Sequence, residues 1–497
     1  MDYLLGIDIG TSSLKASLYD RDLVPVAAAR HEYATSYPSP GCAEQDPEDW
    51  LRALGAAVSE LIGRSGVPAS AIACIGVDGM SSLALPVDGD GAPLGPAMIW
   101  LDRRAAAEAR LDEAAEAEQI AINGNRSDAS NFAPKMMWVR DHQPEIYARA
   151  AHFLHTNAFL VRRLTGIASV DRSEGGLSQI CDLRTGDYSE TLVEARGLDR
   201  RKLPPVVACS EVVGRVTAEA AAWSGLAAGT PVVAGAMDNV AATLGCRLLS
   251  PGDAYIAAGT VTNVGMLVDA PVFDGRGLIY EAGTPGLWLV NGGVDFGGAG
   301  LSWFRDLLGD TDFGELCRLV DGTRAGEAAL FFLPYMVGQR APFWKGDMSG
   351  AIVGLTPAVR RSHLARMFME GTAFGARHAF DTLAGGRPPR AVLTGGITNS
   401  TTWRRLFAEV TGMTLSVPPE AETATLGSAI LAGMGVGLYA SRADAIGLLP
   451  PPEAFSPDPA AAAFYCDLYA VFQDAYAGLS DVLSRLAVLR YPSEVKA

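Results

Sequence analysis

Leu5-Gly6-Ile7-Asp8-Ile9-Gly10-Thr11-Ser12-Ser13 is an apolar run that carries one carboxylate and ends in a glycine turn rich in hydroxyl groups. The apolar residues predict a buried β-strand. A carboxylate inside such a strand needs a partner, because an unpaired buried charge is costly. The turn's backbone N–H groups and hydroxyls could wrap phosphate oxygens, with Asp8 facing a hydrated Mg²⁺. The alternative is a plain hairpin in which Asp8 only caps the turn.

The size and charge of the chain limit what it can be. A chain of 497 residues exceeds the roughly 250–300 residues at which single cores stop growing, so two domains of comparable size are expected. A hydrophobic content of 49% with 19% charged residues is typical of a globular protein with an ample core. The net charge of −16 argues against binding to nucleic acid or to an anionic membrane through a basic surface.

The cysteines and the first residues of the sequence indicate the cellular compartment that we expect for the protein. The seven cysteines are scattered and never in C-x-x-C spacing, which predicts reduced thiols and excludes a zinc ribbon. Met1-Asp2 runs directly into the first strand without a basic leader segment, and no apolar run reaches the ~18 residues of a membrane span. We therefore expect a cytoplasmic protein with no membrane partner.

Strands and helices alternate after the first strand. Apolar runs at residues 14–19, 24–29 and 71–77 predict further strands, and Pro47 opens a helical pattern over 47–65. The order β-β-β-α-β-α is typical of a mixed sheet with helices on its faces, so the expected fold class is α/β.

A second copy of the opening signal occurs late in the chain. Tyr255-Ile256-Ala257-Ala258-Gly259-Thr260-Val261-Thr262-Asn263 is again an apolar run followed by a Gly-Thr turn and hydroxyl residues, half a chain length after the first. The repeat predicts a duplicated domain, with residues 1–245 as one unit and 246–497 as the other. Each unit would present one phosphate-binding hairpin to a shared cleft.

The second half contains three further features. A short strand at 391–394 ends in Gly395-Gly396 and precedes a helix, an arrangement that lets a ligand approach the backbone closely. Residues 418–435 predict a loop and a helix of small residues, which could form a surface for a flat base. The amphipathic stretch 459–488 predicts a closing helix with no chemistry.

Asp238 ends another apolar strand, at residues 231–237, and opens a helix of small residues. It could simply cap that helix, a common role for aspartate. The functional interpretation is a carboxylate that accepts the proton of a substrate hydroxyl during attack on a γ-phosphate. Phosphoryl transfer requires mainly positioning and charge neutralisation, with one carboxylate orienting the nucleophile.

Six short motifs occur in order along the chain: Gly6-Ile7-Asp8-Ile9-Gly10-Thr11-Ser12, Ala43-Glu44-Gln45-Asp46-Pro47, Ile99-Trp100-Leu101-Asp102-Arg103-Arg104, Ala234-Gly235-Ala236-Met237-Asp238-Asn239, Gly259-Thr260 and Thr394-Gly395-Gly396. Together they resemble the FGGY carbohydrate kinases, most closely the xylulokinase-like branch. The resemblance implies two ribonuclease-H-like domains of the actin and sugar-kinase superfamily around a central cleft for ATP and a sugar.

The resemblance also implies roles for individual residues. Asp8 corresponds to the family's magnesium-site aspartate, and Asp238 corresponds to its catalytic base. These two are the expected catalytic residues. The expected ATP-binding residues are Gly10, Thr11, Ser12 and Lys15 at the first phosphate loop, Gly259 and Thr260 at the second, and Gly395, Gly396 and Asn399 at the adenosine loop. The expected substrate contacts are Met80, Ser81, Trp100, Asp102 and Asn239.

The substrate and the partners stay open at this point. Met80-Ser81 stands where xylulokinases carry Met-His, so the phosphorylated molecule could be a ketose, a polyol or a sugar acid. A non-catalytic or chaperone-like nucleotide-dependent sugar sensor of the same superfamily is the alternative function. A small carbohydrate is the expected partner, and a homodimer is an open option.

Overall fold

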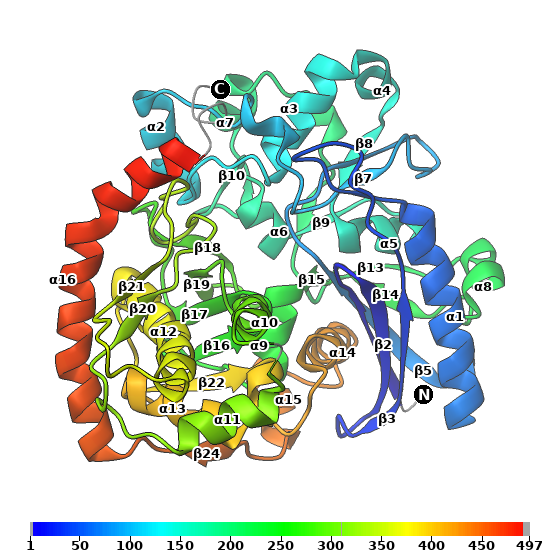
Figure 1. The fold of residues 1–497 in the computed structure, drawn as a ribbon. Helices are drawn as coiled ribbons and strands as arrows, with labels where there is room; N and C mark the ends of the chain where they lie inside the picture. Colours follow the sequence, from blue (N-terminus) through cyan, green and yellow to red (C-terminus); the bar gives the residue numbers. More distant parts are fainter. Residues whose placement is uncertain (1–2, 310, 491–497) are drawn as a thin grey trace.

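The computed structural model describes residues 3–309 and 311–490, which form two sheet-based halves with a further lobe above them in the view of Figure 1. None of the helices in these ranges combines the length and the apolar character that crossing a membrane requires.

The first half is built on one mixed sheet. Its strand order is β13-β14-β5-β1-β2-β3, and β15 also pairs with β5. The strands are β1 (Tyr3–Ile9), β2 (Ser13–Asp20), β3 (Pro25–Glu32), β5 (Ile72–Gly79), β13 (Val212–Arg215), β14 (Pro231–Val233) and β15 (Ala236–Met237). Helices α1 (Pro47–Ser65), α5 (Thr156–Thr165) and α8 (Ala218–Ser224) cover one face. Asp46 caps the start of α1, and Gly66 ends it at φ 68°.

The second half repeats the central plan of the first. Its strand order is β18-β19-β17-β16-β22-β23-β24. The strands are β16 (Ala254–Ala258), β17 (Thr262–Val268), β18 (Leu278–Glu281), β19 (Trp288–Val294), β22 (Arg390–Thr394), β23 (Thr414–Val417) and β24 (Glu453–Phe455). In both halves an antiparallel hairpin, β1–β2 or β16–β17, lies beside a parallel strand, β5 or β22. The internal repeat predicted from the two Gly-Thr turns is therefore present as strand topology.

Within the described residues, five helices cover the outer side of the second sheet. They are α10 (Gly298–Leu307), α11 (Phe313–Asp321), α12 (Arg361–Thr382), α13 (Thr401–Thr411) and α16 (Pro459–Arg490), with the short hairpin β20 (Phe331–Leu333) and β21 (Ala351–Val353). The predicted closing helix is confirmed as α16, which runs along the outer edge of this half (Figure 1). Phe472 of α16 stacks on Phe374 of α12 and closes the core.

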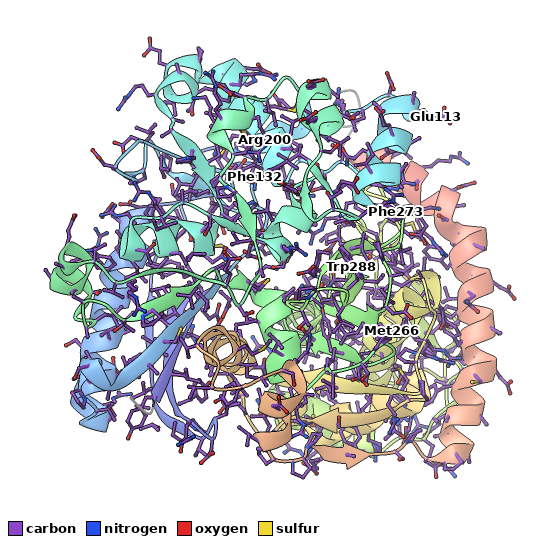
Figure 2. All side chains as sticks on the ribbon, turned by 180° about the vertical axis from the view of Figure 1, so that it is seen from behind. Glu113, Phe132, Arg200, Met266, Phe273 and Trp288 are labelled. Atoms are coloured by element: carbon purple, nitrogen blue, oxygen red, sulfur yellow. The ribbon has the colours of Figure 1, made fainter. Side chains whose placement is uncertain are left out.

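Short elements form the upper lobe. They are β4 (Glu44–Gln45), β6 (Leu85–Val87), β7 (Ala97–Met98), α2 (Glu113–Asn123), α3 (Phe132–His142), α4 (Pro144–Arg149), β8 (His152–Leu154), β9 (Val170–Asp171), α6 (Arg172–Leu177), β10 (Cys181–Asp182), β11 (Asp187–Tyr188), α7 (Glu190–Ala195) and β12 (Val206–Val207). Phe132, Met136 and Phe153 belong to a separate apolar cluster in this lobe. Figure 2 shows Phe132 and Arg200 here, away from Met266 and Trp288 in the second half.

Helix α14 (Thr423–Gly435) lies between the two sheets, beside α9 (Asp238–Gly245) and near α15 (Arg442–Leu448) (Figure 1). It packs directly on β1 and β5 because glycines there leave room for helix backbone. A Cβ atom at Gly6 would lie 1.9 Å from the carbonyl oxygen of Thr425, and one at Gly76 would lie 1.9 Å from that of Ser428. The expectation that this helix offers its small residues to a flat base is wrong, because Thr425 to Gly433 are buried between the halves.

Substitution of Gly76 by alanine tests this packing. The added methyl group must displace helix backbone, so we expect Gly76→Ala to lower the free energy of unfolding by about 2 kcal/mol or more. Gly63→Ala is the matched control: Gly63 lies on the exposed face of α1, and a Cβ there meets no atom within 4 Å. The control should leave stability unchanged or raise it by up to ~1 kcal/mol. Equal thermal unfolding midpoints for the two variants would contradict the packing argument.

Candidate active site

Asp8 and Asp78 occupy matching positions at the ends of two parallel strands. β1 pairs with β5 so that Asp8 lies opposite Asp78. Both side chains are buried, with exposed fractions of 7% and 0%. Ser428 of α14 donates a hydrogen bond of 2.6 Å to Oδ2 of Asp78, while Oδ1 of Asp78 is buried without a partner. Burial, and then the charge of Asp8, raises the pKa of Asp78 well above its ordinary value.

Asp238 joins these two carboxylates from a third strand. β15 pairs with β5 so that Ala236 lies opposite Asp78, and Asp238 follows two residues later at the start of α9. Since neighbouring strands lie about 4.8 Å apart, Asp8 and Ala236 flank β5 within ~10 Å of each other. The structure therefore brings the predicted pair Asp8 and Asp238 to the same end of these neighbouring strands.

The environment of Asp238 favours a base that titrates near neutrality. Its Oδ1 accepts a hydrogen bond of 2.6 Å from the backbone N–H of Asn239, which orients the carboxyl group. The exposed part of the side chain faces a cavity. Burial, followed by the negative charge of Asp8, raises the pKa of Asp238 to about 7.

Asp78 is a functional candidate that the sequence reasoning missed. The signal was present, because the apolar strand β5 carries a carboxylate at its second-to-last residue, just as the opening strand does. What the sequence does not show is the register, which sets Asp78 opposite Asp8 on one side and opposite Ala236, two residues before Asp238, on the other.

A cavity of about 220 Å³ adjoins Asp238 and is lined by both halves of the molecule. The first half contributes Thr11, Met80, Ser81, Ser82, Trp100, Asp128, Ser130, Asn131, Asp238 and Asn239, and the second half contributes Val261, Asn263, Leu278, Asn291, Asp295, Arg340 and Trp344. Four of the five predicted substrate contacts, Met80, Ser81, Trp100 and Asn239, are in this wall.

Hydrogen bonds fix the wall from the side of the first half. Trp100 Nε1 donates to Thr11 Oγ1 at 3.0 Å, and Ser82 Oγ donates to Asn131 Oδ1 at 2.8 Å. Lys135 is buried beneath the wall, and its ammonium group donates to the carbonyl oxygens of Ser82, Met98 and Ile99 at 2.6, 3.2 and 2.7 Å. Burial lowers the pKa of Lys135 to about 7.

Asp102 is not brought to the cavity, and its predicted contact with substrate is corrected. Its side chain has an exposed fraction of 0%. One oxygen accepts the backbone N–H of Ala43 at 2.8 Å, and Arg104 pairs with the same carboxylate at 2.7 Å. Asp102 therefore holds the loop that carries Trp100, and its hydrogen-bonding capacity is already used.

The predicted phosphate-loop residues lie at two hairpin turns. Gly10 donates its N–H to the carbonyl oxygen of Ser13 at 3.1 Å, which closes the first turn. Lys15 reaches Glu422 at 2.7 Å and Asp8 at 3.8 Å. Thr11 faces the cavity, while Ser12 is exposed.

The second turn packs against the start of α10. Gly259 and Thr260 are exposed, and their carbonyl oxygens accept the N–H groups of Gly298 and Gly297 at 2.5 and 3.0 Å. Thr260 lines a groove that adjoins the cavity.

The predicted adenosine loop lies beside the second turn. Thr394 pairs with Ala257 of β16, so Gly395 follows at the same sheet edge as Gly259. Gly395 has φ 92°, and a Cβ atom there would lie 2.3 Å from the carbonyl oxygen of Ala258. Gly396 and Asn399 lie in a short 3₁₀ turn (Gly396–Asn399) and are exposed. These residues form a surface edge that a ligand can approach.

The acidic cluster fits a divalent cation. Asp78 has an unpartnered buried oxygen, and burial, followed by the charge of Asp8, disfavours the ionised forms of Asp78 and Asp238. Among residues 3–309 and 311–490, no group of three or more His, Cys, Asp or Glu side chains is arranged to hold a metal ion. Mg²⁺ characteristically takes one or two protein carboxylates and fills its remaining positions with water and phosphate oxygens. Asp8 and Asp78 have the chemistry for that arrangement.

Comparisons with known proteins agree with this fold. Residues 3–245 match the model for the N-terminal domain of the FGGY family of carbohydrate kinases, and residues 254–436 match the model for its C-terminal domain. A gluconokinase from Bacillus subtilis is 27% identical over 88% of this chain and 88% of its own length. A glycerol kinase from Aromatoleum aromaticum is 31% identical over 88% of this chain and 91% of its own length.

A solved structure extends the agreement. The crystal structure of a xylulose kinase from Rhodospirillum rubrum has a TM-score of 0.87 at 30% identity and covers 97% of this chain and 99% of its own. The predicted two-domain α/β fold is confirmed. The chain belongs to the FGGY family of carbohydrate kinases.

Proposed function

We propose that this chain transfers the γ-phosphate of ATP to a hydroxyl group of a small polyhydroxylated carbohydrate, with Asp238 as the proton acceptor. One observation carries the proposal: Asp8, Asp78 and Asp238 converge at adjacent strand ends, and Asp238 borders a cavity walled by both halves. A non-catalytic sensor needs no such base, so the geometry favours the kinase.

Asp238 supplies the proton acceptor at the reacting hydroxyl. As the substrate oxygen forms a bond to the γ-phosphorus, its proton passes to the Asp238 carboxylate, and the bond from the γ-phosphorus to the bridging oxygen breaks to release ADP. The N–H of Asn239 fixes one carboxylate oxygen, which leaves the other free to face the hydroxyl. Positioned proton acceptors of this kind contribute about 10²–10⁴-fold in rate.

Asp8, backed by Asp78, is proposed to hold a hydrated Mg²⁺. When bound, this ion neutralises phosphate charge and aligns the γ-phosphate with the attacking oxygen. The unpartnered oxygen of Asp78 and the buried carboxylate of Asp8 support this assignment.

The remaining ATP contacts are proposed for the exposed loops. Gly10, Thr11 and Ser12 form the first phosphate loop, with Lys15 beside it, and Gly259 and Thr260 form the second. Backbone N–H groups at such turns suit phosphate oxygens. Gly395, Gly396 and Asn399 are proposed to contact adenosine, since they lie beside the second turn. A cytoplasmic location and a homodimer stay predictions from the sequence.

Replacement of Asp238 by asparagine tests the proposed base. Asparagine keeps the shape but cannot accept the proton, so we expect Asp238→Asn to lower kcat by at least ~10²-fold, with the Kd for ATP changed less than about threefold. Asp467→Asn, an exposed position on α16, is the control and should retain full activity. An enzyme-coupled assay of ADP release measures kcat, and titration calorimetry measures the Kd for ATP. Wild-type activity in Asp238→Asn would exclude the role.

The pH dependence of kcat/KM follows from the same carboxyl group. The pKa of Asp238 is raised to about 7, and only the ionised form accepts a proton. We therefore expect kcat/KM to rise about tenfold per pH unit below pH 7 and to level off above it. A profile that is flat from pH 5 to 8 would show that the group titrates near its ordinary value and would contradict the environment described for Asp238.

A further inference from the structure

The basic side chains in and around the cavity wall are already engaged. Arg340 pairs with Asp295 at 2.9 Å, and Arg103 pairs with Asp128 at 2.5 Å. Arg104 pairs with Glu44 as well as with Asp102, each at 2.7 Å. Lys135 is buried and donates only to backbone carbonyls. In this part of the structure, a substrate carboxylate would therefore meet only basic groups that are already paired with a carboxylate or bound to backbone carbonyls.

Acidic groups dominate the charged part of the wall. Asp128, Asp238 and Asp295 line the cavity, and Arg340 is the basic residue among its lining residues. Burial acts to raise the pKa of Asp128, but Arg103 and the hydrogen bonds from Ser130 hold it below its ordinary value, so Asp128 is ionised at neutral pH. The negative charge of a substrate carboxylate would be repelled by these side chains.

The neutral part of the wall suits hydroxyl groups. Hydroxyl and amide side chains recur around it, namely Ser81, Ser130, Asn131, Asn239, Asn263 and Asn291. Such groups both donate and accept hydrogen bonds, as do the hydroxyls of a polyol. The carboxylates of Asp128 and Asp295 accept hydrogen bonds only, so they can be satisfied by a substrate hydroxyl but not by an ionised carboxyl group.

We infer that the cavity selects an uncharged polyol or ketose over a sugar acid, and that the Asp295–Arg340 pair is the selecting element; this rests on the proposed kinase function. Arg340 is fixed on two sides. Its Nη2 donates to Oδ1 of Asp295 at 2.9 Å, and its backbone N–H donates to Oδ2 at 3.3 Å. Its guanidinium also lies over the ring of Trp100, at 5.6 Å from the centroid. A substrate carboxylate would have to bind Arg340 beside Asp295, whose negative charge repels it.

Matched substrate pairs test the selectivity. Glycerol and glycerate, xylitol and xylonate, and D-glucitol and D-gluconate differ within each pair by a CH₂OH group in place of a carboxylate. We expect the uncharged member of the accepted pair to have at least a tenfold higher kcat/KM in the ADP-release assay, a ratio equivalent to about 1.4 kcal/mol. A higher kcat/KM for the acid would overturn the inference alone. No ADP release with any member of the panel, nor with xylulose, would contradict the proposed function and the inference together.

A variant separates the ion pair from the rest of the cavity. Asp295→Asn removes the partner of Arg340, so we expect the ratio of uncharged to acidic substrate to fall by at least tenfold, chiefly through a lower KM for the acid. Asp295→Glu keeps the charge and should retain the wild-type ratio. Asp141→Asn is the matched control, because Asp141 pairs with Arg140 at 2.7 Å on the surface of α3. An unchanged ratio in Asp295→Asn would show that the pair does not select the substrate.

Discussion

Three carboxyl groups at the ends of adjacent strands, two of them buried and the third, Asp238, bordering the cavity, are the constraint on which the site depends. Their like charges repel one another, and the surrounding protein excludes much of the water that would otherwise solvate them. The result is a raised pKa at Asp78 and at Asp238, and a local demand for positive charge. A phosphoryl-transfer site uses both properties, because it needs a base that titrates near neutrality and a place for a divalent cation. Such sites are retained for function at the expense of stability.

The glycine-lined contact of α14 keeps this cluster between the two halves. Gly6 and Gly76 lie on the strands that carry Asp8 and Asp78, and both leave room for the backbone of α14. The same helix supplies Ser428, which binds Asp78 directly. Helix α14 therefore contributes both to the packing between the halves and to the electrostatics of the site. The cavity beside it takes its walls from both halves, so the Asp295–Arg340 pair of the second half faces residues of the first.

Local sequence patterns were sufficient for much of this account. The Gly-Thr turns after apolar strands predicted the repeated hairpins, and the ends of apolar strands located Asp8 and Asp238. Long-range geometry was not accessible in the same way. Asp78 gains its role from its register against Asp8, and α14 gains its position from glycines more than three hundred residues away in the chain. Asp102 resembled a substrate contact until its partners, Ala43 and Arg104, were known. The ion pair between Arg340 and Asp295 likewise could not be predicted from the sequence, because it depends on the folded chain.

In the proposed reaction, the nucleotide and the carbohydrate meet between Asp8 and Asp238. A crystal structure with Mg²⁺, a non-hydrolysable ATP analogue and the accepted carbohydrate tests it most directly. We expect a γ-phosphate beside Asp8 and one substrate hydroxyl within hydrogen-bonding distance of the Asp238 carboxylate, in line with the γ-phosphorus. A carbohydrate bound outside the cavity, or a γ-phosphate remote from Asp8, would contradict it.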